Sequence, residues 1–290
     1  MKKYLPCFLS FLVLGLLIAP MRGGYLDFGP FEGFCLSSFA GALIGYFLLW
    51  YFLSKQNSVW TWVAALVGLY LFSLPMHLIN PIGTMKHLLE MVIHFVALFC
   101  AFASYRYMKN KYVRYVFTLL VFIGVYGMSV PMYYKWVHYV SFGTPSGMLK
   151  QQERADDVCF LTEEGDSIRL SSWRGKTLVL DFWSRRCGIC WHTFPQVQAL
   201  YEKYRDSSDV MVASVFVAEK EDDWEKAREK FRQDYSFPVY HVNWKDAFLE
   251  KWKIDRVPTV IILDAEGKMF FRGNLMNAEN YLQKAFPVEE

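Results

Sequence analysis

Long apolar stretches in the first half of the chain constrain its fold more than any other feature. Between residues 1 and 140 there are five, at about residues 4–20, 34–53, 59–79, 88–105 and 115–134, separated by short polar breaks. Four of them reach the length of about 17 to 25 residues that a membrane-spanning helix needs. The first is short, and residues 18–21 make a poor signal-peptide cleavage site, which favours an uncleaved helix. We therefore predict an N-terminal all-α transmembrane bundle, residues 1–140, with about five segments.

Basic residues in the polar breaks predict how this bundle is oriented. Lys and Arg in short loops stay on the cytoplasmic side of a membrane. The break from Arg106 to Arg114 holds four positive charges and the break at 54–58 holds one. With both breaks inside, five crossings from a cytoplasmic N-terminus, or four if the first segment is removed, leave the rest of the chain outside. We expect a multi-pass protein of the inner (cytoplasmic) membrane whose C-terminal domain is periplasmic.

Beyond residue 140 the composition changes. Lys, Arg, Asp and Glu are concentrated after residue 150, while the net charge of the whole chain is only +3. That balance gives no electrostatic footprint for nucleic acid, and no nucleic-acid partner is expected. Residues 141–154, which contain Gly143, Pro145 and Gly147, show neither apolar period and are predicted to be a linker. Residues 155–290 are expected to form the second domain.

The order of apolar runs in this domain predicts an α/β fold. The expected strands are Val158–Leu161, Ser167–Leu170, Thr177–Trp183, Val210–Val217, Val260–Leu263 and Lys268–Arg272, and the expected helices are Phe194–Arg205, Asp222–Tyr235 and Asn277–Phe286. The first two strands flank a turn and predict a hairpin. The third is apolar except for Asp181, which indicates a strand buried on both faces and therefore a buried carboxyl. The alternative for Asp181 is a solvated strand end.

Cys187 and Cys190 are the only closely spaced pair among the six cysteines. Two cysteines separated by two residues suit a redox-active disulfide, half of a zinc site, or a structural disulfide. A zinc site needs two further ligands, and only His192 and His241 are near. The position of the pair, after a buried strand and before a helix, favours the redox interpretation. Cys159, on the first strand of the hairpin, is expected to lie in the core.

The position of the pair at a helix start predicts different roles for the two cysteines. Unpaired N–H groups and the helix dipole favour a thiolate on Cys187, which is thus the expected nucleophile, and Cys190 is the expected resolving thiol. Arg185 and Arg186 would lower the pKa of Cys187 further if they stay near the sulfur; the alternative is that they point into solvent. The intervening Gly188-Ile189 tunes the redox poise without revealing its direction.

Three motifs together resemble the thioredoxin superfamily. They are Asp181-Phe182-Trp183-Ser184-Arg185-Arg186-Cys187-Gly188-Ile189-Cys190, Pro195, and Val257-Pro258-Thr259. The membrane anchor, the leading hairpin, and the segments 170–176, 237–239 and 264–267 are similar to the TlpA/ResA branch. The resemblance covers about residues 155–288 and implies a central mixed sheet flanked by helices.

The resemblance also implies roles for single residues. Pro258 would be a cis proline beside the active site, and Asp181 a buried acid that transfers protons to the resolving cysteine. Val257, Trp183 and Thr259 would contact an extended client segment. The implied activity is that of a thiol-disulfide oxidoreductase in redox homeostasis, with no cofactor other than the Cys187-Cys190 disulfide. The implied partners are extracytoplasmic protein thiols and disulfides and a separate membrane redox partner.

This sequence departs from the family pattern at three positions. Arg186 and Ile189 stand where an aromatic residue and Pro are common, and Thr193 stands where cytochrome-maturation members have Glu. A cytochrome-maturation role is therefore not predicted. The direction of electron flow stays open, with reduction of clients favoured over oxidation. The alternative function is a transport or metal- or haem-handling membrane protein in which the thioredoxin-like domain senses redox state.

Ionisable residues within the apolar half are the remaining candidates. His87, Glu90 and His94 share one helix face, and His77 lies near a helix end, so a metal, haem or proton-relay site is one interpretation. A polar cluster that packs helices together is favoured, and no metal site is predicted. Cys7, Cys35 and Cys100 are interpreted as small buried hydrophobes rather than a dithiol relay. Gly41 and Gly45 are expected to pack helices within the chain.

Overall fold

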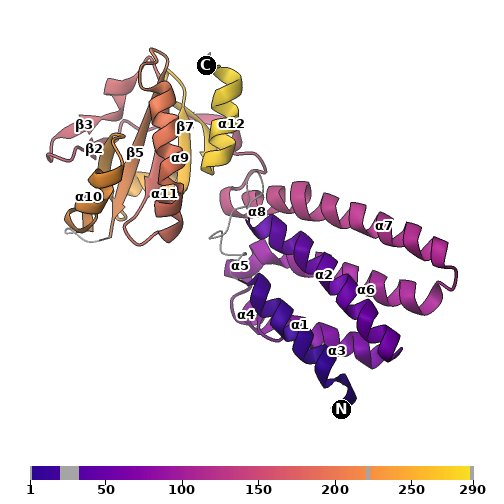
Figure 1. Cartoon of the computed structure of the whole chain (residues 1–290). Helices are drawn as coiled ribbons and strands as arrows, with labels where there is room; N and C mark the ends of the chain where they lie inside the picture. Colours follow the sequence, from indigo (N-terminus) through magenta and orange to yellow (C-terminus); the bar gives the residue numbers. More distant parts are fainter. Residues whose placement is uncertain (1, 20–32, 220–222, 288–290) are drawn as a thin grey trace. The chain divides into compact units, whose positions relative to one another are not determined.

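The computed structural model describes residues 2–19, 33–219 and 223–287, and it divides into two compact units, Met1–Ser141 and Phe142–Glu290 (Figure 1). The first unit is helical. Its main helices are α1 (Leu5–Ile18), α2 (Gly33–Lys55), α3 (Val59–Tyr70), α4 (Ser73–Ile79), α6 (Leu88–Tyr107), α7 (Lys111–Gly127) and α8 (Tyr133–Phe142). Short segments complete it: 3-10 turns at Lys2–Tyr4 and Met85–His87, α5 (Pro81–Thr84), and a π-helical segment at Met128–Met132 between α7 and α8.

Within the part of this unit that the structure describes, three helical stretches are long and apolar enough to span a membrane. They are Cys35–Lys55, Met85–Tyr107 and Lys111–Phe142, and α3 with α4 makes a fourth candidate that is bent by 59° at the break between the two helices. The other predicted stretch, residues 4–20, contains α1, which has 14 residues. At 1.5 Å per residue it is about 21 Å long, shorter than the ~30 Å hydrocarbon core.

Glycines allow the helices of this unit to approach one another. Helix α1 lies beside α3, and α2 lies beside α6 (Figure 1). A Cβ atom on Gly41 of α2 would lie 2.6 Å from Nε2 of His94 on α6, whereas one on Gly45 would meet Leu98 at an ordinary 3.4 Å. The expectation that Gly41 and Gly45 pack helices within the chain is confirmed.

The two basic breaks lie at the same end of the first unit. Arg106, at the end of α6, donates a hydrogen bond to the Asn57 side chain in the break between α2 and α3, at 3.4 Å. The hydroxyls of Tyr4, before α1, and Ser58 are 3.3 Å apart. The cationic residues of the N-terminus and of both breaks are therefore grouped at one end of the bundle.

The second unit is built on an eight-stranded mixed sheet with the order β1-β8-β7-β4-β5-β6-β2-β3. The strands are β1 (Met148–Arg154), β2 (Cys159–Leu161), β3 (Ser167–Arg169), β4 (Thr177–Trp183), β5 (Val210–Ala218), β6 (Val239–Asn243), β7 (Thr259–Leu263) and β8 (Lys268–Gly273). β4 is parallel to β5 and antiparallel to β7, and β2 and β3 form the predicted hairpin. The predicted fold class, a transmembrane helical region followed by a mixed sheet with flanking helices, is confirmed.

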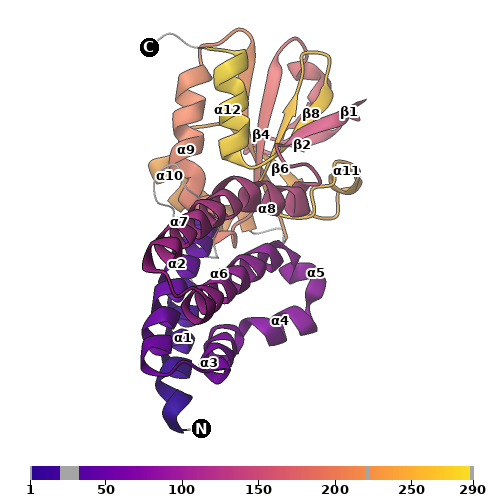
Figure 2. The same cartoon turned by 90° about the vertical axis from the view of Figure 1, so that its right-hand side faces the viewer.

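Helices cover both faces of the sheet. α9 (Gly188–Tyr204), α10 (Asp223–Asp234) and α12 (Leu275–Ala285) pack on one face, and the short α11 (Ala247–Lys251) packs on the other. Figure 2 shows α9 and α12 side by side on their face of the sheet. Every residue of β4 is buried, and its side chains alternate between the two faces. Val179 and Trp183 belong to the core beneath α9, so Asp181, which alternates with them, faces the same way.

Some elements lie outside the sequence predictions. Residues 148–154, assigned above to a linker, form β1, which pairs with β8 from Met148↔Phe271 to Arg154↔Lys268. An edge strand is held through its backbone on one side and needs no apolar alternation, so its sequence carries little signal. Strand β6 and helix α11 were also not predicted, and α9 begins at Gly188, six residues before the predicted helix.

Candidate active site

The cysteine pair lies at the N-terminus of α9. Cys187 is the N-cap residue of this helix, and a disulfide joins it to Cys190, with the two Cα atoms 5.3 Å apart. The Cys190 N–H also points to Cys187 Sγ, at 3.2 Å. Cys187 is partly exposed, whereas Cys190 is only 1% exposed. A reagent from solvent therefore reaches Cys187 first, and its sulfur lies at the helix end, where the Cys190 N–H and the helix dipole favour a thiolate.

Asp181 is buried on the sheet face that α9 covers. Its residue exposure is 3%, which excludes the solvated strand end. Within the described part of the chain, its Oδ2 atom has no hydrogen-bond partner. Burial raises the pKa of this carboxyl from 3.8 to about 7, because the charged form loses its hydration. Near neutral pH the group can therefore both accept and release a proton.

The Val257-Pro258 peptide bond is cis and directly precedes β7. Thr259 pairs with Phe182 across the sheet, so the cis peptide lies beside the end of β4 from which the loop to Cys187 leaves. Cys187, Ile189 and Val257 pack, partly buried, against the same core cluster. The motifs that are far apart in the sequence are thus neighbours at one end of the sheet.

Two residues expected to contact a client are inaccessible. Trp183 is fully buried and packs on the rings of Trp191, Phe194 and Phe231. Thr259 is 1% exposed, and its hydroxyl donates to the Arg256 carbonyl at 2.8 Å. These side chains help to shape the core, and the expectation of a client contact now rests on Val257, which is partly exposed.

Both arginines before the pair are engaged with carboxylates. Arg185 Nε lies 3.1 Å from Oδ1 of Asp223, the first residue of α10, and Arg186 Nη1 lies 3.5 Å from Oε2 of Glu219, just after β5. Neither arginine points simply into solvent. Glu219 and Asp223 were missed by the sequence reasoning, because no local pattern connects an ion pair across more than thirty residues.

The zinc alternative gains no geometric support. His192 is exposed on α9, while His241 lies in β6 against the ring of Trp224, with ring centroids 4.6 Å apart. Burial, followed by the charges of Arg232 and Arg228, lowers the pKa of His241 to about 4. Among the described residues no group of three or more His, Cys, Asp or Glu side chains is placed to hold a metal ion.

Glu90 and His94 of the first unit are buried between helices, whereas His77 and His87 are half-buried. Glu90 is fully buried, 3.3 Å from the Ser37 hydroxyl and 3.4 Å from that of Tyr133. His94 Nε2 lies 3.0 Å from the Ser38 carbonyl. The contacts join α6 to α2 and α8, as the favoured interpretation of a helix-packing cluster expects.

The other cysteines have separate surroundings. Cys7 and Cys35 are buried and point to different backbone carbonyls, those of Thr61 and Val130. Cys159 is exposed, so the expectation that it lies in the core was wrong. It stands on the open face of β2, where only the central residue, Phe160, points inward.

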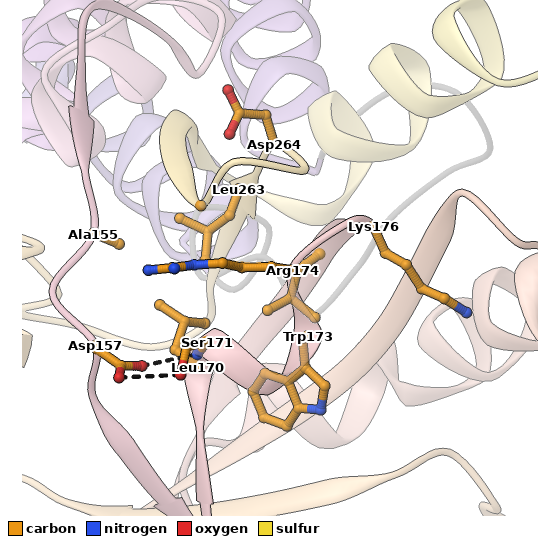
Figure 3. A pocket seen from close by; sticks show the side chains of 11 residues that line it. Ala155, Asp157, Leu170, Ser171, Trp173, Arg174, Lys176, Leu263 and Asp264 are labelled. Atoms are coloured by element: carbon orange, nitrogen blue, oxygen red, sulfur yellow. Dashed lines mark hydrogen bonds between the residues drawn. The ribbon is translucent and has the colours of Figure 1, made fainter.

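A surface pocket lies at the opposite end of β4 from the cysteines. Its lining includes Trp173, Arg174 and Lys176 before β4 and Leu263 at the end of β7. Figure 3 shows the Arg174 side chain extending across it and Asp157 bonded to Ser171. Since β4 has seven residues at about 3.3 Å each, the pocket is roughly 20 Å from the pair and does not belong to this site.

The mixed sheet, the disulfide at a helix start and the neighbouring cis proline define the class: residues 142–290 contain a thioredoxin-like domain. The protein family described as thioredoxin-like matches residues 175–269. The thiol-disulfide oxidoreductase ResA of Geobacillus kaustophilus is 27% identical over 151 residues, covering 52% of this chain and 80% of ResA. ResA of Bacillus cereus is 25% identical over 185 residues, covering 62% of this chain and 99% of the relative.

A solved structure is also similar. The thioredoxin domain of a thiol-disulfide oxidoreductase from Bacteroides vulgatus is 24% identical, with a TM-score of 0.42, and covers 47% of this chain and 98% of that domain. The family match and the ResA relatives show that the chain carries a thioredoxin-like domain with distant homologues among the ResA thiol-disulfide oxidoreductases.

Proposed function

We propose that this protein is a membrane-anchored thiol-disulfide oxidoreductase that reduces disulfides of extracytoplasmic client proteins through Cys187 and Cys190. The observation that carries the proposal is the arrangement of the pair: an accessible sulfur at the N-terminus of α9 with a buried sulfur behind it. A structural disulfide would not require this asymmetry. The ResA relatives support the same chemistry.

The exchange proceeds in two steps from the reduced pair. The Cys187 thiolate attacks one sulfur of the client disulfide, forming a mixed disulfide and releasing the other client sulfur as a thiolate. Cys190, once deprotonated, attacks Cys187 Sγ, forming the internal disulfide and releasing the second client thiolate. Two electrons have then passed to the client, which takes up two protons. A dithiol of a separate membrane redox partner returns the pair to its reduced form by the reverse exchange.

Asp181 is the proposed proton acceptor for Cys190. It lies on the sheet face beneath α9, and burial raises its pKa to about 7, close to the working pH of a general base. Direct transfer requires the carboxylate and the thiol to approach, or one water to bridge them. Val257 would offer backbone groups to the client beside the cis peptide.

The proposed location is the inner membrane, with the thioredoxin-like domain on the periplasmic side. The clustering of Lys55, Arg106 and the residues around them at one end of the bundle supports a cytoplasmic assignment of that end. If both breaks are cytoplasmic, the chain leaves and returns between them, so the bent pair of α3 and α4 crosses the membrane and α6 crosses back. The stretch Lys111–Phe142 then carries the chain outward.

Insulin-type disulfide reduction by the full-length protein in detergent tests the activity. We expect Cys187→Ser to reduce the rate to that of the reductant alone, because no attacking sulfur remains on the surface of the pair. Cys159→Ser is the matched control, since Cys159 is an exposed free cysteine of the same domain and should leave the rate unchanged. Undiminished reduction by Cys187→Ser would exclude the proposed function.

A further inference from the structure

Resting on the proposed function, we propose that Glu219 and Asp223 keep the redox poise of the Cys187-Cys190 pair on the reducing side by neutralising Arg185 and Arg186. These carboxylates come from the junction of β5 and α10, not from the motif that carries the cysteines. They act on Cys187 through the arginines and are therefore positioning residues.

The two arginines directly precede the attacking cysteine in the chain. Arg186 directly precedes Cys187 and Arg185 lies two residues before Cys187, so their Cα atoms lie within about 4 and 7 Å of the Cys187 Cα atom. A Debye length at physiological salt is about 8 Å, and an uncompensated guanidinium within that distance of the sulfur would stabilise the Cys187 thiolate. A more stable thiolate stabilises the reduced protein, which makes it a stronger oxidant.

Each carboxylate opposes that effect by pairing with one of the arginines. Asp223 is the deeper partner: its side chain is 4% exposed, Oδ1 accepts from Arg185 Nε, and Oδ2 accepts from the Glu219 N–H at 3.2 Å. It therefore holds the Arg185 guanidinium at the start of α10. Glu219 meets Arg186 at the surface, where the side chains are 39% and 59% exposed.

The loop itself is fixed by a second contact. The Arg185 carbonyl accepts a hydrogen bond from Trp191 Nε1 at 3.0 Å, and the ammonium group of Lys230 lies 4.7 Å above the Trp191 ring. Asp181 on β4 is buried on the face that α9 covers, and His192 on α9 is exposed. Arg185 and Arg186 are the nearest cations in sequence, and each has its own carboxylate.

The test measures the acidity of the Cys187 thiol without any client. Alkylation of Cys187 is followed against pH by mass spectrometry, in full-length Cys190→Ala protein. We expect Glu219→Gln to raise the acid dissociation constant of Cys187 about threefold, or about half a pKa unit. In protein with both cysteines, the equilibrium with glutathione should shift toward the dithiol by up to the same factor, about 14 mV toward a more oxidising potential.

Three further variants separate electrostatics from folding. Glu225→Gln removes an equally negative, exposed side chain from α10 and should change neither quantity. Arg186→Gln combined with Glu219→Gln should restore the wild-type values, because the arginine that Glu219 neutralises is gone; a merely structural effect would not be reversed. Asp223→Asn should shift both quantities in the same direction as Glu219→Gln.

A shift with Glu219→Gln no larger than with Glu225→Gln, or one that persists in the double variant, would overturn the proposal. Loss of the proposed function is separate, because it would show in the insulin assay of the wild-type protein while leaving these client-free measurements intact.

Discussion

Asp181 and His241 are two buried titratable residues whose effects on stability oppose one another. Burial raises the pKa of Asp181 from 3.8 to about 7 and lowers that of His241 from 6.5 to about 4. Between about pH 4 and 6.5 the folded protein holds a proton on Asp181 that the unfolded chain loses, and lacks one on His241 that the unfolded chain gains. As pH rises, Asp181 therefore lowers the free energy of unfolding while His241 raises it.

Replacing Asp181 with Asn should remove the Asp181 contribution to the pH dependence of the free energy of unfolding. At pH 8 we expect Asp181→Asn to be more stable than the wild type, by about 4 kcal/mol at most, because the carboxylate no longer has to be ionised in the core. The gain should vanish near pH 4. Native-state hydrogen exchange of β4 and β5 in the full-length protein measures it, after correction for the chemical exchange rate. A stability difference that is the same at pH 4 and pH 8 would contradict the raised pKa of Asp181.

Residues differ in how far the neighbouring sequence predicts their burial and their contacts. The burial of Asp181 could be predicted because apolar neighbours flank it within one strand. The inaccessibility of Trp183 and Thr259 could not, since it depends on helices that pack from elsewhere in the chain. The carboxylate partners of Arg185 and Arg186 also come from distant parts of the sequence. The exposure of Cys159 depends on which face of a three-residue strand is covered.

At the scale of elements, most strands and helices of the thioredoxin-like domain follow from local apolar patterns. The strand Thr177–Trp183 was predicted with the bounds that β4 has. Helix α9 begins earlier than predicted because Cys187 caps it, and its buried face already starts at Cys190, one turn before Phe194. In the first unit, α3 and α4 occupy one predicted stretch, and the bend between them leaves no compositional trace.

The packing of α2 on α6 depends on one glycine. Gly41→Ala would push a Cβ to 2.6 Å from His94 Nε2, so the ring must move and its contact with the Ser38 carbonyl is lost. We expect a cost of about 1 to 3 kcal/mol from overpacking and the unsatisfied group, seen as a lower midpoint of heat-induced unfolding in detergent. Gly45→Ala, one turn away with room for a methyl group, should be neutral or slightly stabilising. Equal midpoints for the two variants would argue against the tight packing at Gly41.

At the scale of the whole molecule, the proposed membrane topology decides whether the thioredoxin-like domain faces the proposed extracytoplasmic clients. Native Cys159 is exposed in the thioredoxin-like domain, and Tyr107 is 72% exposed in the basic break. A membrane-impermeant thiol reagent applied to intact cells with a permeable outer envelope should label Cys159, and Cys159→Ser shows the background. Tyr107→Cys should be labelled only after the inner membrane is opened. Labelling of Cys159 only after that step would reverse the proposed orientation.

The membrane spans show which features of the whole molecule could be predicted from the sequence and which could not. Apolar length identified the stretches around α2, α6 and α7, which reach span length. The stretch 4–20 was also predicted as a span, and it contains the short α1, because apolar composition does not give the length of the helix that forms. Its packing beside α3, with Tyr4 next to Ser58, is a tertiary feature.

Trapping the exchange intermediate tests the central claim most directly. In Cys190→Ala the resolving sulfur is absent, so a client that reacts with Cys187 should remain attached as a mixed disulfide. We predict that cells producing this variant accumulate disulfide-linked adducts that disappear on reduction. The adducts should be lost in Cys187→Ser with Cys190→Ala, and mass spectrometry should place the link at Cys187. Absence of adducts from Cys190→Ala, or their persistence in the double variant, would contradict disulfide exchange through this pair.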